Sequence, residues 1–199
     1  MQGVEEREAK LAVPTGFRLP PLDVAGVTVV DHGDTLLDAV YWDTDGLELA
    51  CAAIGLRHRN GTWTFKGRSA REGDAVVREE VEIDGEAQRL PEAIRQRLGA
   101  LVDVAQLHPV AHVRTIRHRL DIRSDAAGAE LVHDRVTVLD GDREVTDFEE
   151  VEVEFPADSA ALASRLVALV VAAGGVVDTT SKYVRALRAL GHDPPEIEE

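Results

Sequence analysis

The chain has 199 residues, a length that fits one domain with a substantial core. Hydrophobic residues make up 44% and charged residues 30%, as in an ordinary soluble globular protein. The 37 acidic residues outnumber the 22 basic ones, and the net charge of −15 argues against general nucleic-acid binding, which needs an extended basic surface. A small anionic ligand is not excluded, because the basic residues cluster and a bound divalent metal would reverse the local sign.

Elements in chain order follow from the alternation of polar and apolar residues, which predicts eight or nine antiparallel strands. Asn60-Gly61 predicts a tight hairpin, since both turn residues tolerate positive φ. A turn is expected at His32-Gly33-Asp34 and a polar loop over residues 67–74. The strands are expected at residues 4–13, 27–31, 35–41, 56–59, 62–66, 75–83, 110–122, 130–139 and 144–155.

Helices are predicted where the apolar spacing changes to a helical period. Closing the strands into a barrel leaves no exposed edge, and a barrel of about eight strands can hold a small ligand. The expected class is therefore α+β, a closed eight-stranded antiparallel β-barrel with flanking helices. The helices are expected at residues 46–53, 91–98, 160–173 and 181–190, within a single domain over 1–191 that is followed by a disordered acidic tail over 192–199.

The N-terminal composition, the longest apolar run and the single cysteine indicate the cellular compartment and the state of the thiol. Its N-terminus has no apolar signal segment, and the apolar run over residues 162–173 is too short to span a bilayer, so a cytoplasmic protein without membrane contact is expected. The single cysteine, Cys51, cannot form an internal disulfide, and its alanine-rich surroundings predict a buried thiol rather than a reactive one.

Three segments carry glutamates at alternate positions, which places their carboxylates on one face of a strand. Basic residues recur at the same spacing in other segments, such as Arg57 with Arg59. One glutamate row alone favours a solvated sheet face, and one arginine pair alone favours surface salt bridges. Together, the rows indicate a surface that holds metal ions and a polyanion. The acidic rows are Glu6 with Glu8, Glu80 with Glu82, and Glu150 with Glu152 and Glu154.

Glu6-x-Glu8-x-Lys10 resembles the ExExK signature of CYTH domains, the triphosphate tunnel metalloenzymes. Other segments resemble those of the same family in the same order, so the resemblance covers nearly the whole chain. They are Tyr41-Trp42-Asp43-Thr44, residues 54–59, residues 63–66, residues 78–82, the strand with Arg114 and Arg117, Asp134-Arg135-Val136, residues 150–154 and Ser181-Lys182-Tyr183.

This resemblance implies an eight-stranded barrel whose tunnel binds a triphosphate together with Mg²⁺ or Mn²⁺. The implied metal ligands are Glu6, Glu8, Glu150, Glu152 and Asp134, with Glu80, Glu82 and Glu154 in support. The implied phosphate-binding residues are Lys10, Arg57, Arg59, Lys66, Arg114, Arg117 and Lys182.

Two of these positions raise questions of their own. Alternation puts Arg114 on the same face as Ile116, so Arg117 needs a local bulge to share that face. Lys182 stands near a helix start, where the helix dipole disfavours a cation. A bound phosphate would explain its position, and an exposed lysine is the alternative.

The function implied is metal-dependent hydrolysis of a triphosphate, with inorganic triphosphate as the first candidate. A metal-bound water would attack in line, oriented by Glu80 or Glu152 and assisted by Lys66. The alternatives are a non-catalytic triphosphate- or polyphosphate-binding module and an adenylate cyclase. The expected partner is a small triphosphate, with no nucleic acid and no membrane, and the protein is expected to be a monomer or homodimer.

Overall fold

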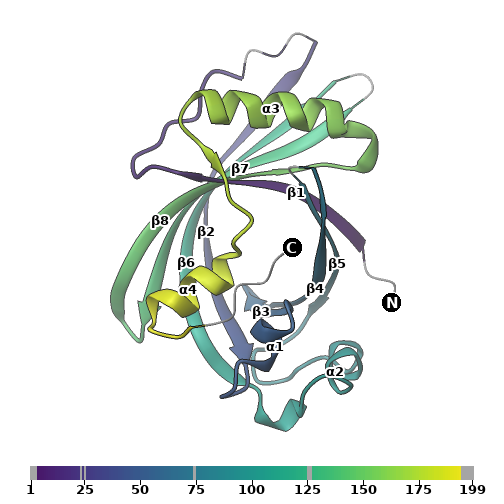
Figure 1. The fold of residues 1–199 in the computed structure, drawn as a ribbon, viewed down its shortest axis with the longest axis vertical. Helices are drawn as coiled ribbons and strands as arrows, with labels where there is room; N and C mark the ends of the chain where they lie inside the picture. Colours follow the sequence, from purple (N-terminus) through teal and green to yellow (C-terminus); the bar gives the residue numbers. More distant parts are fainter. Residues whose placement is uncertain (1–3, 23, 25, 74, 125–126, 194–199) are drawn as a thin grey trace.

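The computed structural model describes residues 4–22, 24, 26–73, 75–124 and 127–193. Within them, nine antiparallel strands follow the order β5-β4-β3-β2-β6-β7-β8-β1-β9, and a further pairing of β5 with β1 closes eight of them into a barrel (Figure 1). The predicted α+β class and closed eight-stranded barrel are therefore confirmed. The strands are β1 Val4–Val13, β2 Thr28–Asp43, β3 Gly55–Arg59, β4 Thr62–Glu72, β5 Ala75–Asp84, β6 His108–Arg123, β7 Gly128–Asp140, β8 Arg143–Glu154 and β9 Val176–Val177.

Helices lie around the barrel, with α3 across one end of the molecule and α1 and α2 at the other (Figure 1). None of the helices in the described residues is long and apolar enough to cross a membrane. The part of the predicted tail from residue 194 to 199 lies outside the described residues. The helices are α1 Glu48–Cys51, α2 Glu92–Leu98, α3 Ala160–Ala172 and α4 Lys182–Ala189, with short 3-10 turns at Val104–Gln106 and Ala157–Ser159.

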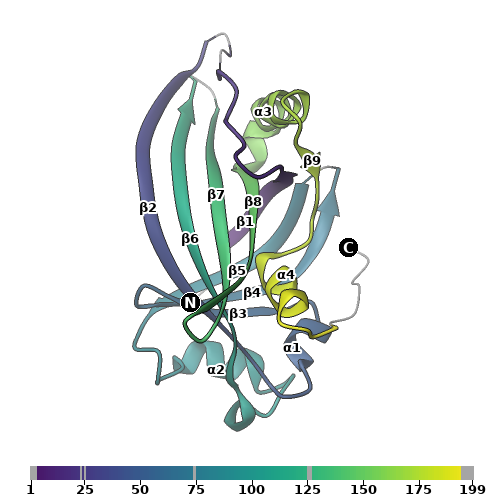
Figure 2. The same ribbon diagram turned by 90° about the vertical axis from the view of Figure 1, so that its left-hand side faces the viewer.

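Three local predictions are wrong. The expected turn around Gly33 is a bulge inside the long strand β2, which keeps pairing with β6 on both sides of it (Figure 2). The expected loop over 67–74 is largely strand, because β4 continues to Glu72 after a register shift between Lys66 and Ser69. Cys51 is exposed, since α1 turns Leu49 and Ala50 inward and leaves the next side chain on the outside.

One apolar cluster of the core lies on the outer face of the barrel wall. On β1, the side chains of Ala9, Leu11 and Val13 pack under α3, where Leu166 and Val170 are fully buried. Burying one such aliphatic side chain stabilises the fold by about 1.5–3 kcal/mol. The alternate positions of β1 face the barrel interior, which is therefore free to hold charged groups.

Asp43 is a fully buried carboxylate that joins three elements. It ends β2 and accepts hydrogen bonds from the backbone N–H groups of Thr44, Leu49 and Ala50 at 2.8–2.9 Å. Its fourth donor is the Tyr183 hydroxyl of α4, at 2.6 Å. This carboxylate thus fixes both α1 and α4 to the end of β2.

Replacing Tyr183 with phenylalanine should lower the free energy of unfolding by about 1.5–3 kcal/mol, the range for a hydrogen bond to a charged group. The ring stacking on Tyr41, with centroids 4.9 Å apart, would remain. Urea denaturation measures the change. Tyr41→Phe is the matched control, because no hydrogen bond of its hydroxyl group is found among the described residues, and it should change stability by less than about 0.5 kcal/mol. Equal effects of the two variants would contradict the role assigned to the Asp43–Tyr183 bond.

Candidate functional site

A cavity of about 490 Å³ occupies the barrel interior and is called the barrel cavity below. Its size falls in the range of small-molecule sites, roughly 300–1,000 Å³. Charged side chains from seven strands and from α4 line it. They are Glu6, Lys10, Arg57, Arg59, Lys66, Arg78, Glu80, Glu82, Arg117, Glu130, Glu152, Glu154, Lys182 and Arg188.

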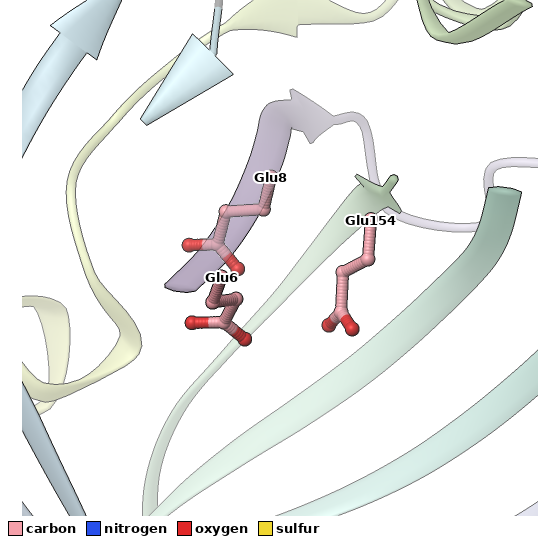
Figure 3. Close-up of side chains that lie close together, drawn as sticks. All are labelled: Glu6, Glu8 and Glu154. Carbon is pink, nitrogen blue, oxygen red and sulfur yellow. The ribbon is translucent and has the colours of Figure 1, made fainter. Parts of the chain in front are cut away.

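The first acidic cluster consists of Glu6, Glu8 and Glu154. Figure 3 shows the two β1 side chains beside that of Glu154 from β8, and oxygens of the three carboxylates lie within 4.8 Å of one another. The sheet register explains this, because Glu8 is paired directly with Glu154. Burial raises the pKa of Glu154 to about 7, and the neighbouring carboxylates of Glu152, Glu6 and Glu8 add to the effect.

The surroundings of the first acidic cluster compensate only part of its charge. Arg78 contacts Glu6 at 3.0 Å and Glu8 at 2.6 Å. Lys66 contacts Glu6 at 3.1 Å and Glu80 at 2.9 Å. Lys10 lies 3.7 Å from Glu8 and 3.3 Å from Glu152, so it is shared with a neighbouring carboxylate. No ion pair of Glu154 occurs among the described residues, so four carboxylates face two cations of their own and a shared third. Three convergent oxygen donors with a surplus of negative charge fit a hard divalent cation such as Mg²⁺ or Mn²⁺.

The second acidic cluster consists of Asp134, Glu150 and Glu152, all buried. The Lys182 Nζ atom lies among them, 2.9 Å from Asp134 and 2.9 Å from Glu152, and it also contacts Glu150. Arg117 donates two hydrogen bonds to Asp134, at 2.8 and 2.7 Å. Burial would raise the pKa of Glu152, but Lys182 and other cations hold it well below its usual range. This cluster is neutralised by side chains of the protein itself.

Arginines form a separate cationic group in the barrel cavity. Arg59 makes no ion pair with any carboxylate in the described part of the chain, although Arg57 lies 3.8 Å from Glu82. Burial lowers the pKa of Arg59 to about 10, and the nearby guanidinium groups of Arg57 and Arg117 lower it further. A partly buried guanidinium repelled by two others favours an anion in the cavity.

Most of the predicted site residues lie together, but Arg114 does not. It is exposed on the outer face of the barrel, 3.7 Å from Asp38. The pairing of β6 with β7 runs without a register shift through this region, so no bulge brings Arg114 and Arg117 to one face. Thr115 and Arg117 face inward, whereas Arg114 and Ile116 face outward, which corrects the assignment of Arg114 to the phosphate site.

The structure also divides the predicted metal ligands. Glu6 and Glu8 lie in the first acidic cluster, where Glu154 joins them, and Glu150, Glu152 and Asp134 form the second. Apart from Arg114, each of the other predicted residues lines the barrel cavity. These are Lys10, Arg57, Arg59, Lys66, Glu80, Glu82, Arg117 and Lys182.

Some cavity residues were not predicted. Arg78 contacts two carboxylates of the first acidic cluster, and its alternation with Glu80 and Glu82 was the sequence signal that could have found it. Arg188, on α4, also lines the barrel cavity, but a single arginine on an amphipathic helix gives no comparable signal. Lys182 begins α4 although the helix dipole disfavours it there, and its contacts with the second acidic cluster account for the position.

The fold and the cavity define a closed antiparallel barrel with a lining rich in carboxylates and basic groups. Residues 5–172 match the family model of the CYTH domain, and the chain belongs to this family. A search of curated proteins found no significant match to the chain.

Three solved structures share the fold. A proposed adenylyl cyclase from Hippeastrum, described as having a dominant triphosphatase activity, aligns with a TM-score of 0.61 at 16% identity, over 96% of this chain and 98% of its own. A proposed adenylate cyclase from Bacillus halodurans aligns with a TM-score of 0.63 at 18% identity, over 93% and 98%. The PH1819 protein from Pyrococcus horikoshii aligns with a TM-score of 0.53 at 14% identity, over 91% and 98%.

Proposed function

We propose that this protein hydrolyses a triphosphate in the barrel cavity with the help of Mg²⁺ or Mn²⁺, and that inorganic triphosphate is its substrate. The observation that carries the proposal is the separation of charge within one cavity. Arg59, with Arg57 and Arg117 nearby, favours an anion, and the first acidic cluster favours a divalent cation. A metal–triphosphate complex supplies both.

The arginines and lysines of the cavity would contact phosphate oxygens in different ways. The guanidinium groups of Arg57 and Arg59 can each donate two parallel hydrogen bonds to phosphate oxygens. Arg117 already donates from Nε and Nη2 to Asp134 and Glu152, so its Nη1 group would face the phosphate. Lys10 and Lys66 carry compact charges that can approach single oxygens, and both line the cavity. Because these cations converge, the transferring phosphoryl group and the pyrophosphate leaving group would both be neutralised during in-line displacement.

Glu6, Glu8 and Glu154 would hold the divalent cation, which supplies charge neutralisation at the phosphoryl group when bound. Glu80 is the residue proposed to orient the attacking water. Burial alone would raise the pKa of Glu80, but Lys66 at 2.9 Å keeps it below its ordinary value, so the carboxylate is ionised and can accept a hydrogen bond.

Glu152 was the other candidate for this role. Its two oxygens already face Lys10, Arg117 and Lys182 at 2.9–3.3 Å. Those contacts and its lowered pKa make Glu152 a poor proton acceptor, and we assign it a positioning role toward the cations. The triphosphatase activity described for the Hippeastrum neighbour agrees with the proposal.

The test is orthophosphate release from inorganic triphosphate, compared with ATP and thiamine triphosphate, in Mg²⁺, Mn²⁺ or excess chelator. The expected result is metal-dependent release that is fastest with inorganic triphosphate and yields pyrophosphate in equal amount. Tight triphosphate binding without release would instead identify a binding module. Formation of cyclic AMP and pyrophosphate from ATP would identify a cyclase.

A further inference from the structure

Each of the two acidic clusters has three carboxylates that could bind a metal ion, but different groups neutralise their charge. In each, oxygens from three carboxylates lie within 4.8 Å of one another. In the second acidic cluster one nitrogen, the Lys182 Nζ atom, contacts all three carboxylates. In the first, none of the ion pairs formed by the described residues places a single cation on all three, and Glu154 takes part in none of them.

The two clusters also differ in how completely nearby cations balance their charge. Asp134, Glu150 and Glu152 are balanced by Lys182, by Arg117 at 2.7 and 2.9 Å from two of them, and by Lys10 at 3.3 Å from Glu152. Three carboxylates therefore face three cations, of which Lys10 also lies 3.7 Å from Glu8 of the first acidic cluster. A divalent ion added here would bring two surplus positive charges into a buried site, which is unfavourable.

The Lys182 ammonium is held in place by its helix and not by the carboxylates alone. Ser181 caps α4 by accepting a hydrogen bond from the Val184 N–H at 3.2 Å. Tyr183, the next residue, is bonded to buried Asp43 and stacked on Tyr41. The helix start is thus fixed on both sides of Lys182, so its side chain has little freedom to leave the cluster.

We propose that the Lys182 ammonium takes the place of a second divalent cation. The substrate-free protein then binds one such ion, at Glu6, Glu8 and Glu154, and loss of Lys182 creates a second metal site on Asp134, Glu150 and Glu152. The proposal rests on the metal site of the proposed function but not on hydrolysis. A protein that binds one Mn²⁺ ion yet releases no phosphate would leave it standing.

The experiment counts Mn²⁺ ions bound per chain in the absence of triphosphate, from the electron paramagnetic resonance signal of free Mn²⁺. We expect one ion for the wild type and two for Lys182→Met, which keeps the length of the side chain but removes its charge. Lys182→Met with Glu150→Gln should return to one ion, because the second site loses a donor. Lys66→Met removes another cavity lysine and should stay at one.

Two ions, or none, bound to the wild type would overturn the proposal before any variant is made. One ion bound to a folded Lys182→Met protein would overturn it as well. In that variant three buried carboxylates face only Arg117 and Lys10, which lowers its stability, so thermal unfolding is followed with increasing Mn²⁺. Its midpoint should rise with Mn²⁺ more than that of the double variant, since each additional site adds stabilisation. Equal rises in the two variants would count against the second site.

Discussion

Arg59→Ala is expected to lower the rate of triphosphate hydrolysis by about 10²–10³-fold, the range for removing one preorganised donor to a developing charge. The same substitution should leave the free energy of unfolding unchanged or higher in the absence of substrate. Arg59 has no carboxylate partner among the described residues, and Arg57 and Arg117 repel it. Activity and stability therefore move in different directions, which a general structural defect would not produce.

Phosphate release and urea denaturation, measured on one preparation, test this expectation. Arg114→Ala is the matched control, because it removes an arginine from the outer face of the same barrel, beside Asp38. The control should keep its activity within about twofold, the effect of a surface substitution of up to 0.5 kcal/mol. A strong loss of activity in Arg114→Ala, or a clear loss of stability in Arg59→Ala, would show that the cavity is not organised as proposed.

Glu154→Gln is expected to weaken Mn²⁺ binding by at least about 10–100-fold. Removing a residue that only hydrogen-bonds a metal ligand already lowers metal affinity by this factor, and Glu154 is proposed as a ligand itself. Hydrolysis at limiting metal should fall with it. Unlike Glu8, which is bonded to Arg78 at 2.6 Å, Glu154 has no ion pair within the described residues that the change would break. The metal-free variant should therefore be at least as stable as the wild type, because the neighbouring carboxylates repel an ionised Glu154.

Isothermal titration with Mn²⁺ measures the affinity directly. Glu79→Gln provides the matched control, because this glutamate lies on β5 and faces Arg97 at 3.5 Å instead of the barrel cavity. Its Mn²⁺ affinity should equal that of the wild type. If Glu154→Gln also binds Mn²⁺ like the wild type, the first acidic cluster is not the metal site.

Regular alternation made much of the fold predictable. The Asn60-Gly61 hairpin is present as expected, with φ of 50° and 86° at its two turn residues. The bulges were missed because a glycine or a polar run inside a strand has the same composition as a turn. Gly33 shows this, since its φ of 70° is accommodated without ending β2. Only pairing with a neighbouring strand distinguishes the two cases.

For the candidate site, alternation tells which residues of one strand share a face but not how rows on different strands line up. The register that pairs Glu8 with Glu154, and Lys10 with Glu152, comes from the closed barrel. This register places Glu154 in the first acidic cluster and Glu150 in the second. Contacts between α4 and the barrel could not be predicted from the sequence either, because they join residues far apart in the chain.

Closure of the barrel has a consequence for how the chain folds. Strand β1 precedes the other strands of the barrel in the chain, yet its partners are β5 and β8, which lie much further along the chain. Pairings between distant segments are slow to form, because the entropy of closing a long loop is lost before the contacts are gained. The seam between β1 and β8 is also where Glu8 meets Glu154, so a cation held there would stabilise the closed barrel over every partly folded state in which β1 is still unpaired.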